Sequence, residues 1–349
     1  MRQLHVLFAL AAAAALTACG GGGGGDSPAP APNPPAPVPG PAPAPVVGTN
    51  GTLQTSVAPA SYGSDTRRLD AFNELNAARL GAGAGLLAQS TALDTTALDH
   101  ANYLTANGFD SADSAHDETA GLPGFSGTNP FVRMTSAGYN YSFATEVIGD
   151  IGSASATSDC VGDLLDTVYH AASMLSRVAD VGFGFGSGAT AGMCTIDMAS
   201  PLNGGAALQI PPSGAIVAYP FGGATVPHGT FQVANESPRV STALIPAATA
   251  GRPIVVGFRN QDLVAGGSVD ITQFSLATST GTAVPGVILV DSTTTGTNVN
   301  VDANLDAGFA VLVPVAPLAA GTYTVTLHAT ISGGQALALT TWSFTVAAL

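Results

Sequence analysis

The segment from His116 to Gly186 holds the residues best suited to chemistry. Two histidines, His116 and His170, and two carboxylates, Glu118 and Glu146, lie along a stretch that is otherwise apolar and rich in glycine. Only 9% of the whole chain is charged, so this concentration is unusual for the protein. Imidazole and carboxylate groups exchange protons and bind divalent metals. We therefore expect the functional site in this segment.

The charge of the chain excludes several functions. The formal net charge is −14, and the nine basic residues are all arginine. Such an acidic chain repels phosphate backbones, so we expect no nucleic-acid partner. The absence of lysine excludes Schiff-base chemistry and a phosphate-binding loop. The sequence also lacks the G-x-S-x-G, H-E-x-x-H and dinucleotide-binding patterns.

Residues 1–19 have the pattern of an export signal. Arg2 and His5 precede an apolar run from Leu7 to Leu16, which is too short to span a bilayer. The run ends in L-T-A-C, which resembles the cleavage box of bacterial lipoproteins, and Cys19 would then be acylated. The glycine after Cys19, by resemblance to enteric lipoproteins, indicates the outer membrane. The alternative is an ordinary signal peptide with an incidental cysteine.

Three cysteines are present in the chain. With Cys19 taken by the lipid, Cys160 and Cys194 remain, and an even remainder in an exported protein favours one disulfide. The alternative is that Cys160 is a reactive thiol that works with His170.

Residues 20–60 are expected to be a linker without a core of its own. A glycine run covers Gly20 to Gly25, and proline alternates with alanine, valine and asparagine from Ser27 to Pro45. Such a segment forms a semi-rigid, extended spacer. It would hold the folded part away from the membrane while the signal and linker stay disordered.

Residues 61–200 are expected to form one α/β domain. His100 lies on the apolar stripe of one predicted helix, which favours a hydrogen-bonded core histidine over a ligand. Helices interleaved with a terminal hairpin indicate a layered domain. Capping residues and glycines predict four helices, and alternation predicts two strands. The helices are one that Asp65 caps, which runs through Arg79 and ends at Gly81, Gly83 and Gly85; Thr91–Asn107; a short one that Asn129 or Thr128 caps and Gly138 ends; and Asp159–Ala172. The strands are Val181–Gly186 and Met193–Met198.

Residues 211–349 are expected to form an all-β sandwich of immunoglobulin type. Serine, threonine, valine and glycine dominate there, and helical periodicity disappears. Short strands separated by turns are typical of a sandwich, and Pro201 to Pro212 would be the linker before it. The predicted strands are Ile254–Phe258, Val287–Val290, Phe309–Val313, Thr322–Leu327 and Trp342–Val346.

Several short motifs of the first domain occur in a familiar order. They are L-N-A-A-R (Leu75 to Arg79), A-L-D-H-A-N-Y-L (Ala97 to Leu104), the region of His116, P-F-V-R-M-T-S-A-G-Y (Pro130 to Tyr139), Glu146, and His170 ahead of D-V-G-F-G (Asp180 to Gly184). In this order and spacing, Leu69 to Met198 resembles the CAP superfamily (cysteine-rich secretory proteins, antigen 5 and pathogenesis-related proteins) in its bacterial SCP-like form. The resemblance implies a three-layer α-β-α sandwich with a cleft.

The resemblance also implies a site. CAP clefts are lined by two histidines and two acidic side chains, which in some members bind a divalent metal. His116, Glu146 and His170 would take three of these places, with Glu118 as the candidate for the fourth. Zinc or another divalent cation fits such a set. Without metal, Glu146 and His170 would be the catalytic acid and base.

The sequence departs from the family pattern on the polar side of this cleft. The usual Glu-Asn pair is Glu146-Val147 here, and the usual His-Arg pair is His170-Ala171. In the second domain, Ala218 to Pro227 resembles the opening of a module that follows CAP domains in some bacterial proteins. Asp302 to Asp306 begins like a calcium loop but lacks its later ligands, which favours a polar turn.

Three functions are consistent with these features. The leading one is an exported, lipid-anchored module of the cell envelope whose cleft binds a small apolar, lipid-like or peptide ligand. The second is a hydrolase in which His116, Glu146 and His170 position a water molecule. The third is a structural or adhesive protein with a relict cleft.

Overall fold

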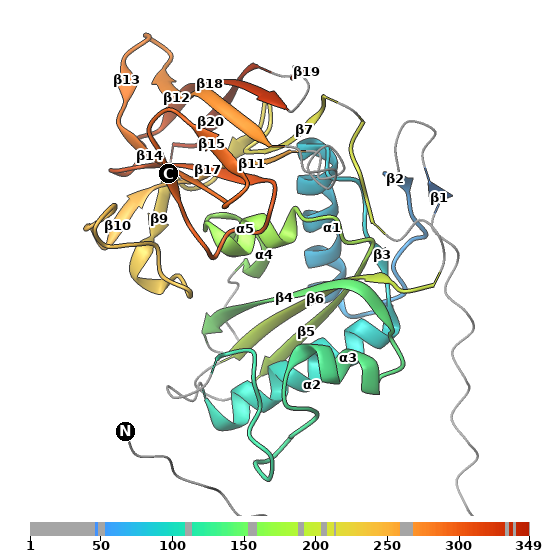
Figure 1. Cartoon of the computed structure of the whole chain (residues 1–349). Coiled ribbons are helices and arrows are strands. Elements are labelled where there is room, and N and C mark those ends of the chain that lie inside the picture. Colours follow the sequence, from blue (N-terminus) through green and yellow to red (C-terminus); the bar gives the residue numbers. More distant parts are fainter. Residues whose placement is uncertain are drawn as a thin grey trace, which may run out of the picture. The chain divides into compact units, whose positions relative to one another are not determined.

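A computed structural model of the chain (Figure 1) describes residues 46–47, 53–108, 114–152, 159–187, 192–203, 208–212, 214–258, 268–331, 335–337 and 340–348. The predicted export signal, Cys19 and most of the predicted linker lie outside these residues. The contacts of Ala42–Leu349 form one compact unit. No helix in the described ranges is long and apolar enough to cross a membrane.

A four-stranded sheet organises the first part of this unit. Its strand order is β3-β5-β6-β4, with β3 at Ala88–Gln89, β4 at Tyr141–Gly152, β5 at Asp180–Ser187 and β6 at Gly192–Pro201. β5 and β6 are the predicted hairpin, and β4 pairs antiparallel with β6. The twelve-residue β4 was not predicted, and it lies at one edge of the sheet.

In the described ranges, five helices accompany the sheet: α1 Thr66–Ala82, α2 Thr91–Asn107, α3 Pro130–Ser136, α4 Cys160–Leu165 and α5 Tyr169–Met174. The first three confirm the predicted helices. Asp65 and Asn129 cap α1 and α3 with their side chains, as predicted, and Ser90 caps α2. Gly83, in the left-handed conformation at φ +81°, ends α1.

The fourth predicted helix, Asp159–Ala172, is wrong, because the structure has two short helices there. The chain leaves helical geometry between α4 and α5. The N–H of Val168 donates to Glu236 Oε2 at 2.8 Å, and the hydroxyl of Thr167 donates to the carbonyl of Leu164 at 2.8 Å. These two bonds replace helical ones, and one of them comes from a residue 68 positions away.

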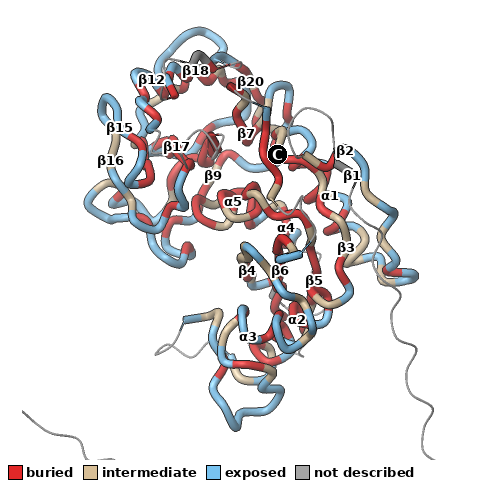
Figure 2. Tube along the Cα trace, turned by 45° about the vertical axis from the view of Figure 1, so that its right-hand side comes forward, coloured by how far each residue is buried: buried red, intermediate tan, exposed pale blue. Residues whose placement is uncertain are grey.

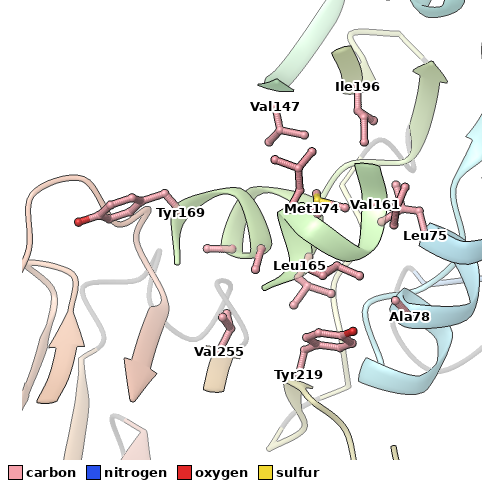
Figure 3. Packing of buried hydrophobic residues seen from close by; sticks show 14 of the residues in the cluster. Leu75, Ala78, Val147, Val161, Leu165, Tyr169, Met174, Ile196, Tyr219 and Val255 are labelled. Atoms are coloured by element: carbon pink, nitrogen blue, oxygen red, sulfur yellow. The ribbon is translucent and has the colours of Figure 1, made fainter. Parts of the chain in front are cut away.

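The two faces of the sheet carry different side chains. Along β4, Val147 belongs to the cluster shared with α1, α4 and α5, whereas Ile148 packs with Tyr103 and Leu104 of α2. Figure 3 shows Val147 beside Met174 and Val161. On β5 the glycines at 182, 184 and 186 face α2, where any Cβ would meet the helix backbone. Glycine therefore lets α2 lie directly on the sheet.

Where it is described, the second part of the unit holds two large β-sheets. One has the order β16-β14-β17-β11-β7 and the other β13-β12-β18-β20-β8, with β15 and β19 at its side. All five predicted strands are present. The bounds are β7 Ile216–Tyr219, β8 Thr225–Val226, β11 Ile254–Phe258, β12 Val269–Thr278, β13 Ala283–Val284, β14 Gly286–Val290, β15 Thr294–Gly296, β16 Val299–Val301, β17 Phe309–Pro314, β18 Gly321–Ile331, β19 Gln335–Ala336 and β20 Thr341–Val346.

Buried side chains of both sheets form one apolar cluster, so they pack as a sandwich. Two short pairs lie outside it: β1 Val46–Val47 with β2 Gln54–Ser56, and β9 Thr230–Gln232 with β10 Thr249–Gly251. A short 3-10 helix, Val233–Asn235, follows β9.

A larger apolar cluster joins the two parts of the unit. It includes Leu75 and Leu165 from the helices and Tyr219 and Val255 from the β-sandwich. Figure 3 shows Tyr219 and Val255 beside α4 and α5, and Figure 2 shows buried segments in both parts. The parts therefore share a core across the boundary that the composition predicts.

The predicted linkers take part in this fold where they are described. Gln54 is buried; its N–H donates to Gln209 Oε1 at 2.7 Å, and its amide donates to the carbonyl of Ala179 at 2.6 Å. Gln209 in turn donates to the carbonyl of Val178 at 2.9 Å. The folded part thus begins before residue 61, because two glutamine amides satisfy backbone groups of the segment that leads into β5.

Candidate functional site

His116 and Glu146 form the centre of the candidate site. Nδ1 of His116 lies 2.8 Å from Glu146 Oε1, and Arg133 donates to Glu146 Oε2 at 2.7 Å. Arg133 also donates to the carbonyl of His116 at 3.1 Å. The side chains of Glu146 and Arg133 are buried, whereas that of His116 is 35% exposed. His116 is therefore the member of this trio that is accessible from solvent.

A second pair, His100 and Glu118, lies against the first. Nδ1 of His100 is 2.9 Å from Glu118 Oε1, and its Nε2 is 3.0 Å from the carbonyl of Ala115. The carboxylate of Glu118 and the carbonyl of Ala115 can only accept hydrogen bonds, so both ring nitrogens of His100 donate. Glu118 also accepts from the N–H of Ser126 at 2.6 Å. His100 is the hydrogen-bonded core histidine that the sequence predicts. These donors hold the carboxylate of Glu118 inside the protein.

Electrostatics keeps both glutamates ionised. Burial alone raises the pKa of Glu146, but the hydrogen bond from His116 and the charges of His100 and Arg133 outweigh it and lower the pKa to about 2. Burial also raises the pKa of Glu118, and the bonds from His100 and Ser126, with the charge of Arg133, lower it below the ordinary value. The cluster is thus a buried set of balanced charges.

A third carboxyl, Asp197, lies next to Glu146 from the neighbouring strand β6, as its cross-strand partner. The hydroxyl of Thr96 on α2 donates to Asp197 Oδ2. Complete burial, followed by the charge and hydrogen bond of Glu146, raises the pKa of Asp197 well above its ordinary value. The protonated form of Asp197 is therefore favoured beside the ionised Glu146.

His116 lies where two cavities meet. A cavity of about 530 Å³ is lined by Phe131, Phe143 and Glu146, and a cavity of about 1010 Å³ by His170 and His228; His116 and Ser114 line both. Because Glu146 holds Nδ1 of His116, the ring has Nε2 left for a molecule in these cavities. Within the described part of the chain, Nε2 has no hydrogen-bond partner.

His170 lines the larger cavity but belongs to a different cluster. Its Nδ1 lies 2.9 Å from Glu236 Oε1 and 3.1 Å from the hydroxyl of Thr167. Glu236 follows the 3-10 helix of the second part of the unit. The structure thus places His116 and His170 along one groove and gives each its own carboxylate.

The predicted metal ligands do not fit a metal ion in this arrangement. His116 and Glu146 face each other and Arg133, whose positive charge would repel a dication. His170 contacts Glu236 instead. No group of three histidine, cysteine or acidic side chains among the described residues has a spacing that could hold a metal. Zinc binding therefore stays a prediction.

Several members of these clusters were not predicted from the sequence. Arg133 lies in a motif quoted for the family resemblance, but its partners could not be read from the motif. Asp166 contacts Arg252, and its Oδ2 lies 3.2 Å from His228 Nδ1. These contacts and that of Glu236 join the α4–α5 turn to the β-sandwich. No local pattern marks them, because the partners lie more than sixty residues apart.

The two remaining cysteines form a disulfide between Cys160 at the start of α4 and Cys194 on β6. The predicted disulfide is therefore present, and Cys160 is not a free thiol. Cys160 also lines the larger cavity. The bond therefore fixes one wall of the groove to the sheet.

The segment from Asp302 to Asp306 is a polar turn, as predicted. Asp302 Oδ1 accepts from the N–H of Asn304 at 2.9 Å. The hydroxyl of Tyr169 on α5 donates to Asp302 Oδ2 at 2.6 Å. The turn thus contacts α5, and Asn304 and Asp306 line the smaller cavity.

Comparisons with known proteins give partial structural similarity only. No family model and no curated protein matches the chain. An extracellular protein containing an SCP domain from Bacillus anthracis is 19% identical with a TM-score of 0.30, over 38% of this chain and 40% of that one. PcoC, a copper resistance protein from Escherichia coli, is 17% identical with a TM-score of 0.22, over 37% of this chain and 95% of that one. The chain thus spans about two fifths of the length of the SCP-domain protein, and these scores assign it to no family.

Proposed function

We propose that this protein is an exported, lipid-anchored module of the cell envelope that binds a ligand in the groove beside His116. The signal-like residues 1–19, the L-T-A-C box and the proline-rich spacer support export and anchoring at Cys19, at the outer membrane. The order of sequence motifs, with helices on both faces of a sheet, supports a CAP-like three-layer domain. The two packed sheets support an immunoglobulin-like second domain.

The observation that carries the binding function is the pair of cavities that meet at His116. Together they bring an imidazole edge, apolar surface, polar side chains and exposed aspartates to one groove. The charged groups beneath His116 are buried and paired with one another. Such a site offers a ligand a shaped cavity, hydrogen bonds and negative charge at its rim.

Hydrolysis is the second candidate, and one contact favours it. A carboxylate that holds Nδ1 of a histidine leaves Nε2 free to accept a proton, which is the arrangement of a general base. His116 and Glu146 have this geometry at 2.8 Å. In this candidate His116 would activate water, and Glu146 would orient the ring.

Titration of the full-length protein with ligands, followed through the imidazole signals in nuclear magnetic resonance spectra, tests the binding function. The probes are the neutral apolar dye Nile red and a random hexapeptide mixture. We expect at least one probe to shift the signals of His116 and His170. His328 on β18 lines neither cavity and is the internal control. If both probes leave His116 and His170 unchanged, the groove is not a binding site, and the adhesive function is favoured.

The same samples test hydrolysis and metal binding. Cleavage of the hexapeptides that is lost in Glu146→Gln, with the circular dichroism spectrum retained, would select the hydrolase. Zinc content is measured beside the His116→Ala/His170→Ala variant. Stoichiometric zinc that the variant loses would show that the groove rearranges around a metal.

A further inference from the structure

The edge strand β4 has an open backbone along the groove. β4 pairs with β6 on one side only, and it is the last strand of its sheet. Between Phe143 and Gly149, the described residues provide no other hydrogen-bond partner for its N–H and C=O groups. An exposed edge of this kind can accept another strand. In this structure it lies inside a groove.

The two cavities follow this edge one after the other. Residues 143–146 of β4 line the smaller cavity, and residues 148–150 line the larger one. Both faces of the strand are already covered by helices. The open side of the groove is therefore the hydrogen-bonding edge of β4.

The opposite wall limits what can enter. Tyr169 and Ser173 of α5 and Asn304 line the smaller cavity, while Thr230 and Gln232 of β9 line the larger. A chain that pairs with β4 would lie between the strand and these walls. The β4 edge of a second copy would bring its whole sheet and would meet the β-sandwich, so a single peptide is the better occupant.

The charge of the lining indicates the type of peptide. Asp117, Asp150 and Asp163 are exposed at the groove. The described residues that line the two cavities include no arginine, and the chain has no lysine. Among the described lining residues, only the histidines can become positive. The groove therefore favours a cationic ligand over an anionic lipid or phosphate.

We propose that the groove binds an extended peptide with basic side chains, which pairs with the free edge of β4 as an additional strand. Main-chain hydrogen bonds to β4 would supply affinity, and the aspartates would select basic residues. His116 would contact the peptide where the two cavities meet. This inference rests on the proposed binding function and specifies its ligand.

Fluorescence anisotropy with the full-length protein tests the mode of binding. The probe is a fluorescein-labelled, end-blocked hexapeptide of alternating arginine and threonine. Two further probes carry N-methyl groups on alternate backbone nitrogens, one in each register. In a strand, alternate N–H groups face the partner. We therefore expect one N-methylated peptide to bind at least tenfold more weakly and the other to bind nearly as well as the parent.

Charge selection and location are tested on the same protein. Replacing arginine by glutamate in the probe should weaken binding at least tenfold, and Asp117→Asn/Asp163→Asn should weaken the arginine peptide several-fold. Asp70→Asn, on the exposed face of α1, is the matched control and should leave binding unchanged. Hydrogen exchange of residues 143–149 should slow on peptide addition, whereas the edge strand β13 should not change.

Equal affinity for both N-methylated peptides, equal affinity for the glutamate peptide, or unchanged exchange in β4 would each overturn the proposal. Shifts of His116 and His170 with Nile red, with no binding of the arginine peptide, would overturn the proposal and keep the binding function. If none of the probes binds, both the peptide proposal and the proposed binding function are wrong.

Discussion

Glu146 and Asp197 show how neighbouring groups can shift the pKa values of two similar side chains in opposite directions. They are cross-strand neighbours on β4 and β6, and both are buried. Arg133 and His116 face Glu146 and keep it ionised, while Thr96 and Glu146 itself face Asp197. Two adjacent buried carboxyls cannot both be charged at low cost, so the one beside the cations is the anion.

Asp197→Asn is expected to stabilise the protein at neutral pH. The raised pKa means that folded Asp197 holds a proton that the unfolded chain releases above its ordinary pKa of 3.8. This cost grows as pH rises above that value, and asparagine removes it while keeping donor and acceptor groups. Urea unfolding from pH 4 to 8 should show a gain that increases with pH. A gain independent of pH would contradict the assignment.

Glu146→Gln is expected to destabilise the protein by about 3–5 kcal/mol at pH 7, because the buried Arg133 loses its close anion and keeps only the more distant Glu118 at 3.7 Å. The pKa of about 2 is below the ordinary 4.5, so this stabilisation is complete above pH 4.5 and is lost as pH falls toward 2. Urea unfolding at pH 7 and pH 3 measures the difference between the two proteins. A difference that does not shrink at pH 3 would show that the carboxylate charge is not the cause.

At the scale of single elements, the close contact of α2 with β5 depends on glycine. Gly182, Gly184 and Gly186 alternate with larger residues that face the opposite side. The pattern D-V-G-F-G-F-G thus combines a strand with a helix-packing face. The glycines of D-V-G-F-G, which were quoted only for the family resemblance, thus have a physical role in the packing of α2 on β5.

Gly184→Ala is expected to cost several kcal/mol, since its methyl group would overlap the backbone of Ala97, which cannot move alone. Gly222→Ala is the matched control, because its methyl group would lie 3.5 Å from the Trp342 Cβ, at ordinary contact distance. Thermal unfolding of both variants measures the effect. Equal melting temperatures would show that α2 can shift away from the sheet.

Removal of the disulfide is expected to lower stability by about 4 kcal/mol, because the bond closes a loop of 34 residues in the unfolded chain. Cys160→Ala/Cys194→Ala, compared with the oxidised protein in urea, measures this effect. Dithiothreitol should destabilise the parent protein and leave the variant unaffected. A reducing agent that acts equally on both would point to another cause.

At the scale of the whole molecule, the α/β part and the β-sandwich share one apolar cluster and the ion pairs of the α4–α5 turn. Leu75 and Leu165 pack with Tyr219 and Val255. The groove beside His116 has walls from both parts. The two regions that composition predicts as separate domains therefore both supply residues to the groove.

A single unfolding transition is expected for both parts. Trp342, the one tryptophan of the chain, lies in β20 and reports the sandwich by fluorescence, while circular dichroism at helical wavelengths reports the α/β part. The two curves should coincide in urea because the core is continuous. Two separate midpoints would show that each part has an independently stable core.

The sequence by itself determined the elements whose signals are local. Asp65, Asn129 and Gly83 mark helix ends through contacts within one turn, so α1 and α3 could be predicted from nearby residues. Alternation over a few residues likewise predicts β18 and β20. The histidines and acids worth examining were also visible, because they are rare in this chain.

Only the tertiary structure decided which of these residues meet. The pairing of Glu146 with Asp197 depends on strand register. The bond between Val168 and Glu236, which lie 68 residues apart in the sequence, depends on the packing of the α/β part against the β-sandwich. The split of the predicted helix Asp159–Ala172 and the open edge of β4 follow from the same long-range packing. A sequence pattern records the preference of a residue for its neighbours along the chain, whereas the charge, burial and partners of a site are set by residues brought in from elsewhere.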